Sequence, residues 1–70
     1  MSILQQHQVR VLEEREELDR KVTALKQFFS TSKFSELTAL DQSLLRNQAR
    51  FMEGYLEVLV DRIINFSAKQ

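Results

Sequence analysis

The sequence predicts an all-α fold: an antiparallel two-helix hairpin with a short intervening turn, which assembles into an oligomeric helical bundle. Its 70 residues include one glycine and no proline, so the residues that usually end a helix are almost absent. Apolar residues recur at helical spacing along most of the chain, with charged residues between them. A chain of this length fits one domain at most, so residues 1–70 are expected to form a single helical domain.

The first helix is predicted over residues 3–29. Its apolar residues recur every seven positions, at Leu4, Val11, Leu18 and Leu25. Two further apolar residues follow the last two of these by four positions, at Val22 and Phe29. A heptad pattern of this kind is typical of a helix that packs against another helix in a coiled coil.

A loop and turn are predicted over residues 30–37, because the three hydroxyl side chains at 30–32 interrupt the heptad pattern. Phe34 and Leu37 are expected to pack beneath this loop as a single turn. The interruption therefore predicts where the chain reverses its direction.

The second helix is predicted over residues 39–66. Thr38 and Asp41 resemble a capping box at its start, with aspartate in place of the usual glutamate or glutamine. Each predicted helix would be about 40 Å long at ~1.5 Å per residue. Because the two lengths match, the helices are expected to pair antiparallel.

The second helix has more apolar surface than one partner helix can cover. Its apolar residues form three rows of seven-residue spacing, at Leu45, Met52, Leu59 and Phe66, at Leu44, Phe51 and Val58, and at Ala49, Leu56 and Ile63. One partner covers a stripe of roughly 100°, and the excess would exceed the exposed patch that soluble monomers tolerate. Without cysteine for disulfides, subunit association is the remaining way to stabilise so small a core. We expect a dimer or a higher homo-oligomer.

A polar row, Asn47, Gly54 and Asp61, lies between two of the apolar rows. Gly54 would let another backbone come close, while Asn47 and Asp61 would fix the pairing register. The alternative interpretation is a polar groove between subunits. Arginine residues precede acidic residues along this helix, which favours an antiparallel encounter of two copies. The residues expected at the oligomer interface are Asn47, Phe51, Gly54, Leu56, Val58, Val60, Asp61 and Ile63.

Composition restricts the partners and the cellular compartment. Ten basic residues balance ten acidic ones, so the broad positive field that attracts duplex nucleic acid is missing. No apolar run approaches the ~20 residues of a membrane span, and the start of the chain does not resemble a signal peptide. The absence of cysteine fits a reducing compartment. We expect a cytoplasmic protein without a membrane or nucleic-acid partner.

The sequence shows no arrangement of residues that predicts catalysis. Acid–base chemistry needs a poised pair of side chains, and nucleophilic chemistry needs an activated nucleophile beside a base. The lone His7 lies near the start of the first predicted helix and cannot build a zinc site, and the glycines of phosphate-binding loops are absent. We therefore expect a protein that is not an enzyme and has neither a metal nor a cofactor.

Two cationic clusters are candidate binding sites. Antiparallel pairing places Arg15, Gln48, Tyr55 and Arg62 at neighbouring levels, where the arginines would bind a phosphate and Tyr55 would stack on a base. The plainer interpretation is that these side chains satisfy one another or a nearby glutamate.

The second cluster lies at the loop end, where Lys33 and Arg50, together with Lys26 and Arg46, surround the start of the second helix. Helix starts attract anions. The alternative is that these residues are ordinary surface cations.

A set of residues spread over nearly the whole chain resembles the small crAss-related proteins encoded by many tailed phages. These residues are Glu14, Leu18, Lys21, Leu25, Phe28, Phe34, Leu37, Asp41, Leu44, Leu45, Gln48, Met52, Tyr55, Leu59, Arg62 and Ile63. One departure is Thr38, where such sequences often have proline, and both residues can start a helix. The resemblance implies a phage accessory protein that acts in the cytoplasm of an infected bacterial host.

Small phage accessory proteins without enzymatic machinery often counter host defence. The function expected from the resemblance is an anti-defence sponge, which binds and sequesters a cyclic nucleotide or an ADP-ribose-type immune signal at subunit interfaces. The alternative is a helical protein–protein interaction module that inhibits a host or phage protein by occlusion.

Overall fold

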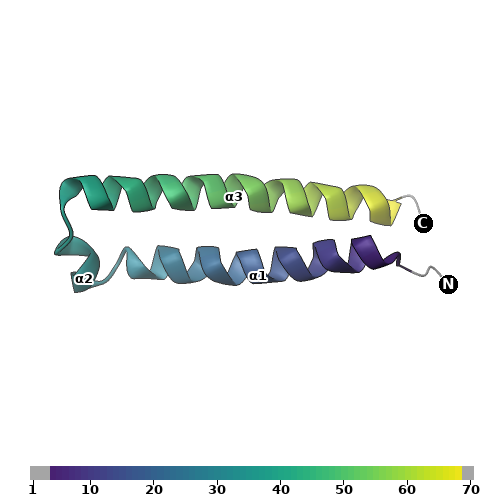
Figure 1. Ribbon diagram of the computed structural model, residues 1–70, viewed down its shortest axis with the longest axis horizontal. Helices are drawn as coiled ribbons and strands as arrows, with labels where there is room; N and C mark the ends of the chain where they lie inside the picture. Colours follow the sequence, from purple (N-terminus) through teal and green to yellow (C-terminus); the bar gives the residue numbers. More distant parts are fainter. Residues whose placement is uncertain (1–3, 69–70) are drawn as a thin grey trace.

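The computed structural model describes residues 4–68, which form three helices. Helix α1 spans Gln6–Phe28, α2 spans Ser32–Ser35 and α3 spans Ala39–Ala68. The two long helices, α1 and α3, pack along each other in opposite directions, and α2 lies in the connection at one end (Figure 1). The molecule is a rod of 52 × 15 × 15 Å. Because residues 4–68 contain no strand, the predicted all-α class is confirmed.

The outer ends of the long helices differ from the predicted bounds. Residue 3, the predicted start of the first helix, lies outside the described residues, and α1 begins at Gln6. The backbone N–H of Gln5 donates to Oε1 of Gln8 over 2.8 Å at this end. Helix α3 continues past residue 66 to Ala68, because no glycine or proline follows Gly54 to stop it.

Helix α2 is one well-packed turn within residues 30–37, where a loop and a turn are predicted. The hydroxyl of Thr31 accepts the backbone N–H of Phe34 over 3.3 Å and donates to the carbonyl of Phe28 over 2.6 Å. Phe34 is only 3% exposed. Its ring lies 5.8 Å from that of Phe28 and 4.9 Å from that of Phe29, measured between centroids. This aromatic cluster closes the α2 end of the rod.

The start of α3 is fixed by side-chain hydrogen bonds. The hydroxyl of Thr38 accepts the backbone N–H of Asp41 over 3.1 Å, which is the capping contact that the sequence predicts. The side-chain amide of Gln42 donates to the carbonyl of Leu37 over 3.0 Å. These contacts satisfy backbone groups where the connection enters α3.

The core between the helices is thin. Among the described residues, the buried apolar side chains are Val11, Val22, Phe34, Ala49 and Leu59. Leu59 is fully buried, whereas Leu56, Val60 and Ile63 are half-buried beside it. Several large apolar side chains of α3 remain exposed, at Leu40, Leu44, Phe51, Val58 and Ile64. The contact between α1 and α3 therefore leaves much of the apolar surface of α3 open.

Candidate functional site

A groove runs along one side of the rod, between α1 and α3. It has two adjoining sections of about 570 Å³ and 560 Å³, which share Lys26, Glu53 and Glu57 in their linings. The apolar floor of the first section comes from Val22, Leu56 and Val60. The two sections differ in the charge of their linings: one is mainly acidic and the other is mainly basic.

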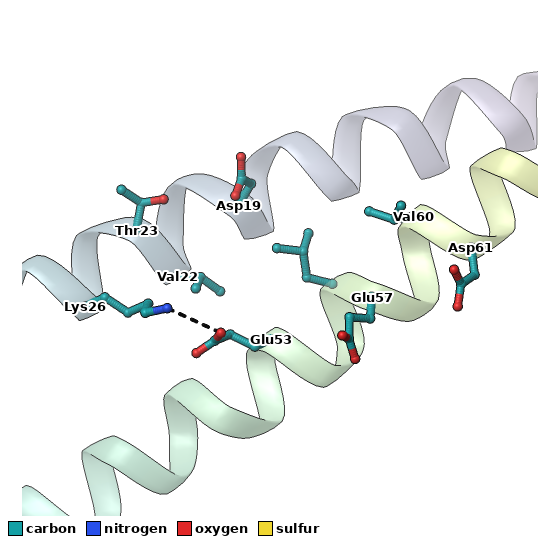
Figure 2. A pocket seen from close by; sticks show the side chains of 9 residues that line it. Asp19, Val22, Thr23, Lys26, Glu53, Glu57, Val60 and Asp61 are labelled. Carbon is teal, nitrogen blue, oxygen red and sulfur yellow. Dashed lines mark hydrogen bonds and ion pairs between the residues drawn. The ribbon is translucent and has the colours of Figure 1, made fainter.

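The first section is acidic and lies towards the C-terminal half of α3. Asp19 of α1 and Glu53, Glu57 and Asp61 of α3 line it (Figure 2). Lys26 is the only cation among its nine lining residues, and its Nζ lies 3.4 Å from Oε2 of Glu53. The net negative charge of the lining disfavours a phosphate in this section.

The second section is basic and lies closer to α2. Its lining contains three cations, Lys26, Arg46 and Arg50, and the aromatic ring of Phe29. The two carboxylates in this lining are Glu53 and Glu57, which the first section shares. Arg46 and Arg50 are four residues apart, so they lie on the same face of α3. The Cζ of Arg46 is 5.1 Å from the ring centroid of Phe29. Cations beside an aromatic ring are the groups that bind a phosphate and a base.

The first predicted cluster is brought together only in part. The hydroxyl of Tyr55 donates a hydrogen bond to Oε1 of Glu14. This hydrogen bond is the largest cause that raises the pKa of Tyr55, with loss of solvent and the Glu14 charge adding to it and the Arg62 charge opposing it. The side-chain amide of Gln48 lies 3.9 Å from the sulfur of Met52. Tyr55 is therefore already engaged by a carboxylate.

A small hollow of about 240 Å³ lies beside Tyr55. Its lining consists of Glu14, Glu17, Leu18, Lys21 and Tyr55. Arg15, Gln48 and Arg62 line neither this hollow nor the groove. The charge of Arg62 nevertheless acts on Tyr55, so one of the predicted phosphate ligands lies near the predicted stacking residue.

The second predicted cluster is brought together more fully. Lys26, Arg46 and Arg50 line the basic section, whereas Lys33 on α2 is exposed and does not line the groove. Sequence reasoning missed Asp19 and Thr23, which line the acidic section. Asp19 and Thr23 are four residues apart on the same side of the helix as Val22, and this spacing could have predicted that they line the groove.

The predicted interface residues divide between the groove and the outer surface. Gly54, Leu56, Val60 and Asp61 line the groove. Asn47, Phe51 and Val58 are exposed, and Ile63 is half-buried.

Between residues 4 and 68 no three histidine, aspartate or glutamate side chains are grouped to hold a metal ion. None of the helices in that range has the length and apolar character needed to cross a membrane.

The fold and the groove define a small all-helical protein whose candidate site is a charged groove between two antiparallel helices. The chain belongs to the Sequestin family, whose sequence model matches residues 5–65. A relative in Enterobacteria phage T4, named "Uncharacterized 7.5 kDa protein in denB-rIIB intergenic region", is 40% identical over 60 residues, which are 86% of this chain and 94% of the relative. No solved structure matches the chain.

These comparisons bear on the family resemblance seen in the sequence. The T4 relative supports the part of that resemblance that concerns small phage proteins. Neither comparison tests the narrower crAss-related assignment, which stays a prediction.

Proposed function

We propose that this chain is a non-enzymatic phage accessory protein that binds and sequesters a nucleotide-type immune signalling molecule, in the cytoplasm of the infected host. The observation that carries the proposal is the basic section of the groove, where Lys26, Arg46 and Arg50 lie beside Phe29. The family name Sequestin supports a sequestering role, and the T4 relative supports an accessory role in a phage.

The chemistry of the basic section suits a phosphate joined to a base. A guanidinium group can donate two parallel hydrogen bonds to phosphate oxygens, which lysine cannot do. Arg46 is oriented by its position near the rings of Phe29 and Phe34, 5.1 Å and 5.0 Å from their centroids. The ring of Phe29 supplies an apolar surface for a base.

An oligomer completes this proposal. One copy presents an open groove on a rod only 15 Å across, whereas small-molecule sites usually bury most of their ligand. A second copy would cover the ligand from the other side. The thin core and the exposed apolar side chains of α3 support association, so we place the ligand at a subunit interface.

The basic section is favoured over the predicted cluster around Tyr55. A ligand that stacks on Tyr55 and accepts its hydroxyl would have to displace Glu14. Glu14 and Glu17 also place two carboxylates beside that ring, against the single Lys21. The charge of Arg62 also acts on Tyr55 but does not outweigh Glu14 there, so this hollow attracts a phosphate less than the basic section does.

Calorimetric titration with cyclic dinucleotides, cyclic trinucleotides and cyclic ADP-ribose isomers tests the proposal. We expect one ligand to bind, and we expect Arg46→Gln to weaken its binding at least tenfold, since losing a charged hydrogen bond costs about 1.5–3 kcal/mol. The matched control is Arg10→Gln, which removes the same charge from an exposed site on α1 outside the groove. Absence of heat across the whole panel would contradict the proposal.

The second candidate function is a helical interaction module that inhibits a host or phage protein by occlusion. The exposed apolar residues Leu44, Phe51 and Val58 on one face of α3 favour it, because apolar helix faces dock into protein grooves. A sequestering protein should gain thermal stability from a small molecule. An occluding module should instead co-purify with a protein.

A further inference from the structure

We infer that an exposed face of α3 is the contact with a second copy of this chain, in which the two α3 helices run antiparallel and Phe51 of each copy lies over Gly54 of the other. This inference rests on the oligomer of the proposed function and specifies its contact residues and register. We call this surface the outer face and define it by Leu44, Phe51, Gly54 and Val58.

The outer face is an apolar row that α1 does not cover. Leu44, Phe51 and Val58 are 55%, 68% and 53% exposed and recur every seven residues. The half-buried Leu56 and the fully buried Leu59 lie on the side of α3 that packs against α1. A heptad row on the other side of the same helix is the surface that a further helix would cover.

Gly54 provides a depression in this row. It lies three residues after Phe51 and four before Val58, so all three share one face of α3. A Cβ atom built at Gly54 would meet nothing within 4 Å. Packing within one chain therefore does not require a glycine there, although glycine weakens a helix interior. A bulky side chain of another copy that comes close to the backbone at residue 54 would explain why this residue is glycine.

The antiparallel register follows from placing Phe51 over this depression. If residue 51 of one copy lies opposite residue 54 of the other, twofold symmetry repeats the contact in reverse. The same register places Val58 opposite Asn47 of the second copy. Each aromatic ring then fills the space that the other copy leaves at its glycine.

The charges on the edge of the outer face fit the same register. Arg50 of one copy comes beside Glu57 of the other, and the symmetry gives this pair twice. Within one chain these residues are seven positions apart, about 10 Å along the helix, so they do not pair with each other. The Cζ of Arg50 lies instead over the ring of Phe51 in the same chain, 5.1 Å from its centroid. A parallel arrangement would instead put the Arg50 and Glu57 positions of the two copies on opposite edges of the contact, so that this pair could not form.

This contact would also add to the candidate site. Gly54 and Arg50 line the basic section of the groove. An aromatic ring placed over Gly54 would therefore extend the wall of that section next to Arg50. The groove of each copy is complete only when the second copy contributes its Phe51.

The first test is sedimentation of Gly54→Gln without any nucleotide. Glutamine favours helix more than glycine does, and its side chain would occupy the space for Phe51. We expect the dimer dissociation constant to rise at least tenfold while circular dichroism shows an unchanged or higher helix content. The matched control is Ala24→Gln at an exposed position of α1, which should associate like the wild type. Unchanged association of Gly54→Gln would overturn the inference.

The second test exchanges the charges. Arg50→Glu and Glu57→Arg should each raise the dissociation constant about tenfold, and the double variant should return it to within about threefold of the wild type, since an antiparallel pair is restored. A double variant no better than the singles would overturn the register. A wild type that stays monomeric at micromolar concentration would overturn the contact itself and favour a different protein on this face. Because no ligand is present, neither result depends on nucleotide binding.

Discussion

The guanidinium group of Arg46 lies near two aromatic rings, and it is one of the three cations that line the basic section. Its Cζ is 5.1 Å from the centroid of Phe29 and 5.0 Å from that of Phe34. Such contacts stabilise an exposed cation by about 0.5–1 kcal/mol each. They restrict the freedom of the side chain before any ligand arrives. Arg46 would therefore lose less entropy on binding than an unrestrained lysine.

Tyr55 offers a spectroscopic prediction, because the chain has one tyrosine and no tryptophan. The hydrogen bond to Glu14 raises the pKa of Tyr55 above its ordinary value. We expect Glu14→Gln to lower that pKa, since the carboxylate charge no longer opposes phenolate formation. Ultraviolet absorbance of the phenolate during an alkaline titration measures it. Glu13→Gln, which removes a charge from the neighbouring position, should leave the titration nearly unchanged.

The sign of the effect on stability follows from the raised pKa. The folded state holds the tyrosine proton more tightly than the unfolded state, so this contribution is complete below the ordinary tyrosine pKa. It is lost as the pH rises through the pKa of the folded state. Equal Tyr55 pKa values in the wild type and Glu14→Gln would contradict the role of this hydrogen bond.

At the scale of elements, the ends of the helices are set by short-range hydrogen bonds and their lengths by the heptad seam. Thr31 caps α2 and Thr38 caps α3, so two hydroxyl side chains define the connection. Both contacts span three residues, so they do not require long-range packing. The reversal of the chain is therefore encoded locally.

The cap of α3 can be tested by Thr38→Ala. We expect a loss of about 1 kcal/mol, because the backbone N–H of Asp41 loses its acceptor. For a chain of this size the melting temperature should fall by roughly 4–8 °C. Thermal unfolding followed by circular dichroism measures it, and Thr38→Ser, which keeps the hydroxyl, should lose much less. Equal melting temperatures for both variants would contradict the capping role.

Local patterns explain what could be predicted from the sequence. The heptads define both long helices, and the Thr38 cap follows from a motif of four residues. The lining of the groove was harder to predict, since it depends on how far α1 and α3 slide and rotate against each other. Arg15 and Tyr55 share a level in a schematic pairing, yet Tyr55 contacts Glu14 instead. One residue of rotation on a helix moves a side chain by about 100°.

At the scale of the whole molecule, the rod is so narrow that few of its side chains are buried. Its extent of 52 Å contrasts with a cross-section of 15 Å, so most side chains reach the surface. Small domains of this kind are marginally stable unless they are supported by other means. Association through α3 would remove apolar side chains from water on a second face.

A dependence of thermal stability on protein concentration follows from this association. If the folded chain is a dimer, its melting temperature should rise by several degrees over a hundredfold increase in concentration, because mass action favours the associated state. Phe51→Ser should reduce this dependence, since it removes the most exposed apolar side chain of the outer face. Melting curves measured at several concentrations test it. A midpoint that does not change with concentration would contradict association.

The first turn of α1 and the last turn of α3 lie together at the end of the rod opposite α2 (Figure 1). A short peptide bridge between these two turns could therefore close the backbone into a ring without bending either helix. Ring closure restricts the unfolded chain far more than the folded one. New ends could then be opened between α2 and α3, which would give a permuted molecule with the outer face intact.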